Sequence, residues 1–445
     1  MNDQKHMGII GGGLVGALLS IYLARRGYRI SVFERRADLR KSEPEEGRSI
    51  NLALSTRGLK ALAEVGLDSA IRNLAIPMHG RMMHDAAGKL SFLPYGKDGQ
   101  FINSVSRSGL NVILLEEAER NGVEFHFNHR CTTVDLHKTS ATFQTGDGKG
   151  KTEEFDIMVG ADGAFSAVRS AMQFTDRFNY SQFYLEHGYK ELEIPAGRDG
   201  GYVLEKNALH IWPRESFMMI ALPNPDATFT CTLFFPFEGE QSFSTLTDDK
   251  KVESFFRKTF PDAIAHMPRL LEDYRANPTS TLVTIRCFPW VRNNTLIIGD
   301  AAHGIVPFYG QGMNAGFEDC RILNELLDNC KDHWPSALEE FQKTRKEDTD
   351  AIAQLAFDNF IEMRDLVADP EFLLRKKIEA RLHELYPEKW IPLYSMVTFK
   401  ENIRYSHAYR TGKKQERIMQ DVMKQPDIEK NWHQLNFREI VDRLS

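Results

Sequence analysis

Three glycines near the N-terminus have a spacing that lets a chain hold a phosphate group. Gly11, Gly13 and Gly16 fit the pattern G-x-G-x-x-G, between an apolar stretch at residues 8–10 and a segment of helical spacing at residues 17–26. The first glycine of this pattern permits a tight turn, the second lets the backbone approach a pyrophosphate, and the third lets the helix pack closely on the strand. The free N–H groups and the positive dipole end of the helix would then face the phosphates.

An acidic residue follows at the distance that a dinucleotide requires. Residues 29–33 read as a second strand, and this strand ends on Glu34, about twenty residues beyond the glycine turn. A carboxylate at that place would accept hydrogen bonds from the hydroxyls of a ribose. Strand, turn, helix and acid together predict a dinucleotide site, and they leave open whether it takes FAD or NAD.

Two more apolar strands run into turns that contain an aspartate. Residues 155–160 lead into Gly160-Ala161-Asp162-Gly163, a turn that fits a cofactor contact and an ordinary capped turn equally well. Residues 295–298 lead into Gly299-Asp300-Ala301-Ala302-His303. The glycines that follow would bring backbone amides close to a flat or anionic group, with Asp300 within reach of a ribose or ribityl hydroxyl. His303 could act as a general base, but it fits equally well as a helix-start residue beneath the cofactor, so we assign it no catalytic role.

The elements that would position these turns change in character along the chain. Residues 80–84 and 90–93 read as the strands of a hairpin that brings Arg81 and Tyr95 close together. From residue 178 to 286 apolar residues alternate along several strands, which predicts an antiparallel sheet inserted into the nucleotide-binding part. A short helix at residues 252–260 should end before Pro261. Beyond Trp334 the sequence is charged and has helical spacing.

The composition argues against several classes of protein. With 56 Lys plus Arg and 62 Asp plus Glu, the formal net charge is −6 and no basic block is present, so nucleic acid is not an expected partner. The five cysteines form no C-x-x-C pair, so no metal site is predicted and a reduced, cytoplasmic location is favoured. No stretch approaches the roughly eighteen apolar residues of a membrane span, so no membrane segment is expected.

The order of the three turns resembles that of the single-component FAD-dependent aromatic hydroxylases, which share the fold of p-hydroxybenzoate hydroxylase. This resemblance selects FAD as the bound dinucleotide. Several longer stretches look like the kynurenine 3-monooxygenase family, and the matching sequence spreads from residue 7 to about residue 410. These stretches are residues 187–192, 209–214, 217–224, 307–314 and 391–399.

We therefore expect an α/β fold with three parts. A Rossmann-like FAD-binding domain would comprise residues 1–70, 98–177 and 287–330. A mainly antiparallel β-sheet domain for the substrate would comprise residues 71–97 and 178–286, and a C-terminal helical domain would comprise residues 331–445.

The resemblance also implies an activity. It is that of an NADPH-consuming monooxygenase that converts L-kynurenine to 3-hydroxy-L-kynurenine, with O₂ and the reduced flavin forming a C4a-hydroperoxide. NADPH would bind transiently, because the sequence has no second G-x-G-x-x-G. Since the flavin carries the oxygen chemistry, no side chain is assigned as catalytic.

Roles for individual residues follow from the same resemblance. Arg81 would give the substrate carboxylate a planar, two-pronged donor, although without the family it would be read as a surface arginine. The other expected substrate contacts are Tyr95, Asn359, Tyr394, Pro307, Phe308 and Gln311. The expected FAD contacts are Gly11, Gly13, Gly16, Glu34, Arg107, Asp300, Met313 and Asn314.

The C-terminal tail departs from the eukaryotic members, which carry a membrane segment there. Residues 415–445 are charged, which favours a soluble bacterial-type enzyme, either a monomer or a homodimer. Three alternatives come from other classes. They are a flavin hydroxylase of another aromatic acid, a non-catalytic FAD-binding protein, and a flavin halogenase, which the missing W-x-W-x-I-P stretch disfavours.

Overall fold

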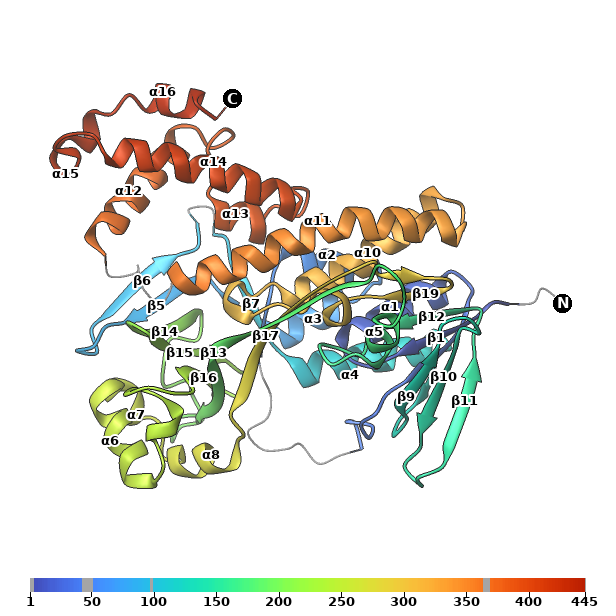
Figure 1. The fold of residues 1–445 in the computed structure, drawn as a ribbon. Coiled ribbons are helices and arrows are strands. Elements are labelled where there is room, and N and C mark those ends of the chain that lie inside the picture. The colour runs from blue at the N-terminus through green and yellow to red at the C-terminus, as the bar shows by residue number, and fades with distance from the viewer. Residues whose placement is uncertain (1–3, 42–50, 97–98, 363–368, 445) are drawn as a thin grey trace.

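The computed structural model describes residues 4–41, 51–96, 99–362 and 369–444, which form an α/β fold (Figure 1). A parallel sheet with its helices lies at one end of the molecule and a larger sheet at the other. Helices from the C-terminal part of the chain run across the top of Figure 1, over both sheets. The division of the chain into three domains with the boundaries given above stays a prediction.

The first sheet uses the apolar segments that precede and follow the three turns. Its order is β18 (Val291–Arg292), β19 (Thr295–Ile297), β12 (Ile157–Gly160), β1 (His6–Ile10), β2 (Arg29–Phe33) and β8 (Glu124–His126). All neighbouring strands are parallel except β18 and β19. Helix α1 (Leu14–Arg25) connects β1 to β2 and is buried along most of its length, which its apolar sequence permits. Helices α4 (Arg107–Arg120) and α10 (Gly312–Asn329) pack against α1.

Two small sheets and three short helices flank this layer. One sheet contains β9 (Arg130–Asp135), β10 (Ser140–Gln144) and β11 (Gly150–Glu154), and the other contains β3 (Asn51–Leu54), β7 (Ile102–Ser106) and β4 (Ile76–Met78). The helices are α2 (Thr56–Glu64), α3 (Asp68–Leu74) and α5 (Ala167–Met172).

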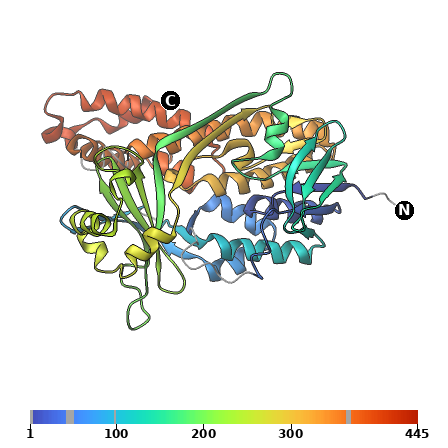
Figure 2. The same cartoon turned by 60° about the horizontal axis from the view of Figure 1, so that its bottom comes forward.

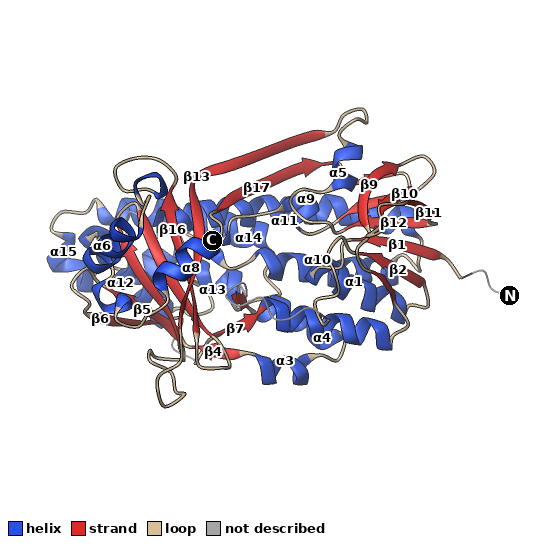
Figure 3. Cartoon of the chain, turned by 90° about the horizontal axis from the view of Figure 1, so that it is seen from below, coloured by secondary structure: helices blue, strands red, loops and turns tan. Residues whose placement is uncertain are grey.

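The larger sheet carries one face of the candidate site. Its order is β17 (Ser280–Phe288), β13 (Asn179–Ile194), β16 (Phe229–Pro236), β15 (Phe217–Pro223), β14 (Ala208–Arg214), β5 (Gly80–His84) and β6 (Leu90–Pro94). Long strands β13 and β17 run from this sheet toward the first one (Figures 2 and 3). Because side chains alternate along a strand, one face packs on α6 (Asp249–Thr259), α7 (Pro261–Ile264) and α8 (Leu270–Ala276), and the other faces the interior.

The C-terminal helices complete the fold. They are α11 (Trp334–Ile361), α12 (Pro370–Leu385), α13 (Leu393–Thr398), α14 (Tyr405–Met423), α15 (Ile428–Asn431) and α16 (Phe437–Asp442). Helices α11, α13 and α14 share a hydrophobic cluster with the inner face of the larger sheet. None of the helices in the described ranges is both long and apolar enough to span a bilayer.

One local expectation needs correction. The helix predicted to stop at Pro261 does end, at Thr259, but Pro261 itself begins another helix, because proline suits a first helical position that needs no N–H donor. The strands within residues 178–286 pair antiparallel, as expected. The hairpin strand β5, from outside that range, joins the sheet by a parallel pairing with β14. The predicted hairpin of β5 and β6 is confirmed.

Candidate active site

A cavity of about 650 Å³ lies between the two large sheets. The glycine turn and Glu34 line it at one side, and Arg81 and Tyr394 line it at the other. The turns at Asp162 and Asp300 also open into it. Segments from distant parts of the sequence therefore meet around one space of the size that small-molecule sites use.

The glycine turn leaves space that any side chain would fill. Gly11 has φ +107°, and a Cβ atom built on it would lie 2.5 Å from the oxygen of Ala161. A Cβ on Gly16 would lie 2.0 Å from the oxygen of Gly11, so helix and turn can approach only without a side chain. No described atom comes within 4 Å of the Cβ position of Gly13, which lines the cavity where α1 begins. The free N–H groups of α1 are thus open to an anion.

Glu34 is held at the end of β2 as a buried hydrogen-bond acceptor. One carboxylate oxygen accepts from the backbone N–H of Gly12 at 2.9 Å, and the other accepts from Arg36 Nε at 2.8 Å. Burial acts to raise the pKa of Glu34, but the hydrogen bonds and charge of Arg36 and the bond from Gly12 outweigh it, so the pKa lies below its usual range. The ionised carboxylate suits ribose hydroxyls.

The other two turns are joined to each other by Arg169. Its guanidinium donates to the oxygen of Ala301 at 2.8 Å and to the oxygen of Ala164 at 2.5 Å. Asp162 accepts from the N–H of Ala167 at 2.7 Å, while its Oδ1 is buried without a hydrogen-bond partner among the described residues. Gly299 adopts φ +61°, which turns the chain so that Asp300 follows at the cavity wall.

These features fit the adenosine and pyrophosphate parts of an FAD. They comprise an open glycine turn at a helix N-terminus, an ionised acid at the end of the next strand, and a buried aspartate oxygen to which no described residue donates. A group that supplies a donor to the Asp162 oxygen would remove the cost of burying it unpaired.

Known relatives share nearly the whole length of this chain. Residues 5–356 match a family described as "FAD binding domain". A protein named kynurenine 3-monooxygenase from Flavobacterium johnsoniae is 50% identical over 448 residues, which cover 100% of this chain and 99% of that protein. One from Anopheles gambiae is 46% identical and covers 95% of this chain and 88% of that protein.

The chain belongs to the kynurenine 3-monooxygenase family.

Solved structures agree on the fold of this kynurenine 3-monooxygenase family member. The tetrameric form of 2-methyl-3-hydroxypyridine-5-carboxylic acid oxygenase superposes with a TM-score of 0.69 and covers 83% of this chain and 95% of its own. Pseudomonas aeruginosa PqsL in complex with 2-aminobenzoylacetate gives 0.66, with 82% and 97% covered. Both are 19% identical to this chain, so they bear on the fold alone. The family match and the cavity make the protein an FAD-dependent monooxygenase.

In this family member the far side of the cavity presents a cation among stacked tyrosines. Arg81 in β5 lies over the ring of Tyr394 in α13, 4.9 Å from its centroid, and over the ring of Tyr95, 5.6 Å away. The two tyrosine rings stack at 5.4 Å, and Tyr309 stacks on the other side of Tyr394 at 5.5 Å. Arg81 Nε is buried and has no hydrogen-bond partner among the described residues. A buried donor in this state suits an anionic ligand.

The predicted site residues fall into two groups. Those that line the cavity are Gly11, Gly13, Glu34, Arg107, Asp300, Met313, Arg81, Tyr394, Pro307 and Phe308. Those behind its wall are Gly16, Asn314, Tyr95, Asn359 and Gln311.

The residues behind the wall support the segments that form it. Asn314 donates to the oxygen of Gly310 and accepts from the N–H of Ser55 at 2.9 Å, while the Asn359 amide donates to the oxygen of Phe308 at 2.7 Å. Gln311 accepts a hydrogen bond from the hydroxyl of Tyr405 at 2.8 Å. These contacts hold the segment between α9 (Asp300–His303) and α10 in place.

Sequence reasoning missed most of the apolar wall. The inner face of the larger sheet lines the cavity with Leu209, Met218, Ile220, Leu222, Thr232 and Phe234. Apolar side chains alternate along β14, β15 and β16, and this pattern indicates strands with two different faces. It does not indicate which face lines the cavity. Tyr309 was missed although its neighbour Phe308 was predicted. Glu362, at the end of α11, lies close enough to Arg81 to interact with its charge.

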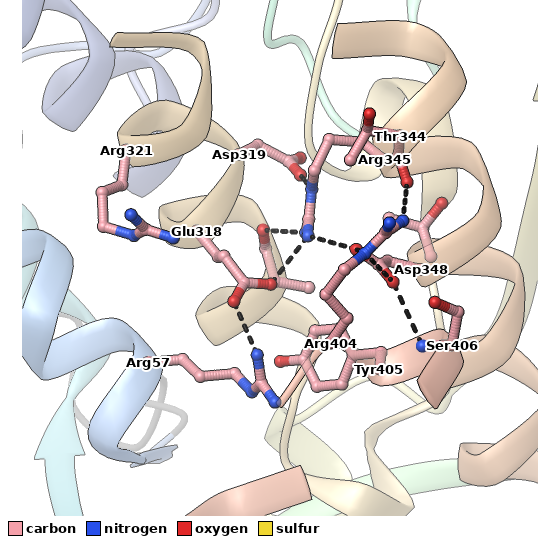
Figure 4. Close-up of polar contacts among 12 residues, drawn as sticks. Arg57, Glu318, Asp319, Arg321, Thr344, Arg345, Asp348, Arg404, Tyr405 and Ser406 are labelled. Atoms are coloured by element: carbon pink, nitrogen blue, oxygen red, sulfur yellow. Dashed lines mark hydrogen bonds and ion pairs between the residues drawn. The ribbon is translucent and has the colours of Figure 1, made fainter. Parts of the chain in front are cut away.

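A buried ionic network fixes α13 relative to the cofactor side (Figure 4). Arg57 of α2 donates to Glu318 at 2.6 Å and to the oxygen of Val397 in α13 at 2.9 Å. Glu318 also accepts from Arg345 at 2.7 Å. Arg345 in turn contacts Asp319 at 2.7 Å. The network thereby connects the helix that carries Tyr394 to α2, α10 and α11.

His303 lies within this network and not at the cavity wall. Its Nε2 lies 2.5 Å from Asp319 Oδ2, and its ring packs on Trp290. Burial acts to raise the pKa of Asp319, but the charges of His303 and Arg345 outweigh it and the pKa lies below its usual range. Since the same Asp319 oxygen accepts from the N–H of Gly299 at 3.3 Å, this pair supports the third turn.

Proposed function

We propose that this protein hydroxylates L-kynurenine to 3-hydroxy-L-kynurenine, with FAD bound and with NADPH and O₂ consumed. The observation that carries the proposal is the Arg81 guanidinium. It has a buried donor without a partner in the described part of the chain, is framed by Tyr95 and Tyr394, and lies in the same cavity as the FAD-type turns. The name shared by the relatives supports kynurenine as the substrate.

The substrate's two ends find matching surroundings in this cavity. Its α-carboxylate would accept charge-assisted hydrogen bonds from Arg81, with the Tyr394 hydroxyl beside it. Its aromatic ring would lie against the apolar wall that Ile220, Phe234 and Phe308 provide. Anchoring one end and packing the other fixes the orientation of the ring.

The protein's share of the reaction is orientation and the exclusion of water. Bound FAD would supply the oxygen-transfer chemistry after its reduction by NADPH. Gly11, Gly13 and Glu34 would hold its adenosine and pyrophosphate, with Arg107, Asp300 and Met313 farther along the cavity. The amino group of the kynurenine ring already activates the carbon beside it, so no protein base is needed for the attack. The apolar wall keeps water from the reacting atoms.

Purified protein loaded with FAD would test the proposal directly. We expect L-kynurenine to stimulate NADPH oxidation, and the product to have the mass of kynurenine plus one oxygen atom. A panel containing 4-hydroxybenzoate, anthranilate and 2-aminobenzoylacetate separates kynurenine from other aromatic acids. Faster NADPH oxidation with one of these than with kynurenine would overturn the substrate assignment, and a flavin that NADPH does not reduce would overturn the activity.

A further inference from the structure

The hairpin that carries Arg81 and Tyr95 is held by backbone pairing along one side. Strand β5 pairs with β14 through four residue pairs, and β6 follows as the outer strand with every residue exposed. Backbone hydrogen bonds of His79 fix the base of the hairpin. The N–H of His79 donates to the oxygen of Asn207, and the oxygen of His79 accepts from the N–H of Tyr95. Its far end needs another attachment, because an edge hairpin with one paired side is the least secured part of a sheet.

That attachment lies on the back of the sheet, at the last residue of β5. His84 Nδ1 lies 2.5 Å from Asp262 Oδ2 at the start of α7, and His84 Nε2 lies 2.8 Å from His210 Nδ1 in β14. His210 Nε2 lies 2.8 Å from the oxygen of Glu205. Trp212 donates to the same Asp262 oxygen at 2.9 Å and stacks on the His84 ring at 3.9 Å. Both histidines are about 1% exposed.

The partners in this chain fix where the protons lie. A carbonyl can only accept, so His210 Nε2 carries a proton toward Glu205. A neutral His210 then presents Nδ1 as an acceptor, so His84 Nε2 must donate to it. The remaining contact, between His84 Nδ1 and Asp262, needs one more proton. With this proton on His84, an imidazolium faces the Asp262 carboxylate; with the proton on Asp262, a neutral imidazole faces a carboxylic acid. The pair of His84 and Asp262 therefore shares one proton beyond those of a neutral imidazole and a carboxylate.

The surroundings agree with this proton count. Burial lowers the pKa of His210 to about 4, which keeps this ring neutral near pH 7. Burial acts to raise the pKa of Asp262, but the hydrogen bonds from His84 and Trp212 outweigh it, so its pKa is lowered. The face of Trp212 would favour a charged His84 ring stacked on it.

The other charged groups around the cluster come from neighbouring elements. Arg214 at the end of β14 donates to the oxygens of His84 and Asp85, at 3.0 and 3.1 Å, and its charge acts on Asp262. Glu205 and Asp85 are the acidic groups nearby. Arg214 also donates to the oxygen of Thr259 at 2.7 Å, so it ties this end of β5 to β14 and to the end of α6.

We propose that His84, Asp262 and His210 form a proton-sharing clamp that holds the hairpin 79–95, and so positions Arg81 for the substrate carboxylate. Arg81 points to the cavity face of β5 and His84 to the opposite face, three residues later in the same strand. The role of Arg81 rests on the proposed function, whereas the clamp itself does not. His84 is a positioning residue, because it lies outside the cavity wall.

Steady-state kinetics on His84→Gln and Asp262→Asn test the positioning. We expect each to raise KM for L-kynurenine about tenfold, with kcat changed by no more than about twofold and FAD retained. The KM of the double variant should be no higher than that of either single variant, because both substitutions break the same contact between His84 and Asp262. His187→Gln is the matched control, since it removes another buried histidine from the same sheet. Unchanged KM in folded, FAD-containing variants, or additive effects, would overturn the clamp.

A pH profile separates the clamp from a general loss of packing. In the wild type, KM should rise at a pH where the shared proton is lost, because the contact between His84 Nδ1 and Asp262 Oδ2 then has no hydrogen to join the two atoms. The KM of His84→Gln should be high already and lack this rise. The substrate's own amino group titrates equally in both, so the difference belongs to the clamp. Parallel profiles would refute the proposal.

A third readout does not depend on the substrate. NMR of wild-type protein with ¹⁵N-labelled histidine measures the protonation of the two His84 ring nitrogens. The His84 signals are assigned as those that disappear in His84→Gln. We expect these signals to show the extra proton that His84 shares with Asp262. A His84 ring that carries a single proton at pH 7, beside an ionised Asp262, would overturn the clamp even if no variant folds. If Arg81→Ala leaves kynurenine affinity unchanged while this signature is present, the proposed function fails and the clamp stands.

Discussion

Arg81 combines three properties that suit an anion-binding residue. It lines the cavity, it has a buried nitrogen without a hydrogen-bond partner among the described residues, and its guanidinium lies over two aromatic rings. Burial acts to lower the pKa of Arg81, but its interactions with Tyr394, Tyr95 and Glu362 outweigh burial, so the pKa is raised and the charge is kept. A fixed, desolvated cation of this kind is suited to one carboxylate at a defined place.

Replacing Arg81 therefore tests the anchor at the residue scale. We expect Arg81→Ala to raise KM for L-kynurenine about a hundredfold, because the substrate carboxylate loses one or two charge-assisted hydrogen bonds. The flavin-to-protein ratio should be unchanged, because Glu34 and the glycine turn lie at the other side of the cavity. Arg177→Ala serves as the control, since Arg177 is exposed with a side chain 91% accessible. An unchanged KM for Arg81→Ala would remove Arg81 from the substrate site.

At the scale of elements, the three turns act as one cradle because short contacts lock them together. Gly16 packs against the oxygen of Gly11, and Arg169 bridges the second and third turns. A side chain at the closest of these approaches would have to displace backbone, which cannot yield as a flexible side chain can.

Gly16→Ala tests that cradle. A methyl group would lie 2.0 Å from the Gly11 oxygen, so the turn and α1 must separate. We expect a protein that purifies with little or no flavin, measured by its absorbance relative to protein. Gly150→Ala is the matched control, because no described atom lies within 4 Å of its Cβ position. Full flavin content in Gly16→Ala would show that the tight approach is not needed for binding.

The position of α13 depends on a second set of contacts, those of Arg57. Arg57→Leu leaves Glu318 with one cation fewer in a buried setting and frees the carbonyl of Val397. We expect a loss of about 3 kcal/mol in unfolding free energy, as for other broken buried pairs, and weaker kynurenine binding because α13 carries Tyr394. Thermal melting and a binding titration measure the two. Arg321→Leu, which loses a pair with the largely exposed Glu325, is the control and should change neither.

For the whole molecule, stability should depend on pH through His210. Burial lowers its pKa from 6.5 to about 4, so the folded state resists a proton that the unfolded state accepts. The contribution of His210 to the free energy of unfolding is complete above pH 6.5. It is lost as the pH falls toward 4, and the total loss is about 3 kcal/mol. His6 and His126, whose pKa values burial also lowers, act in the same direction.

Denaturant unfolding of wild type and His210→Gln between pH 7 and 4.5 isolates this effect. The wild type should lose stability faster with acidification, because the variant has no histidine at this position to protonate on unfolding. His137→Gln, at an exposed residue, should follow the wild type. Equal slopes for wild type and His210→Gln would contradict a buried neutral His210.

Much of the first sheet was predictable because its signals are local. A strand, a glycine turn, a helix and an acid occur within thirty-four residues, and the backbone conformations they require depend on those residues alone. The hairpin of β5 and β6 was predictable for the same reason. The parallel pairing of β5 with β14 was not, since about 125 residues separate the two strands and no local pattern sets the direction of such a pair.

The sequence by itself determined the three turns and the strands before them, and the family resemblance drew attention to Arg81 and Tyr394. Tertiary structure alone decided that the Arg81 guanidinium lies over the Tyr394 ring, that Gln311 and Asn359 lie behind the wall, and that His84 pairs with Asp262. A turn is set by the dihedral preferences of a few neighbouring residues. Which distant side chains meet, and on which side of a wall, is set by how whole elements pack, and packing is a property of the complete fold.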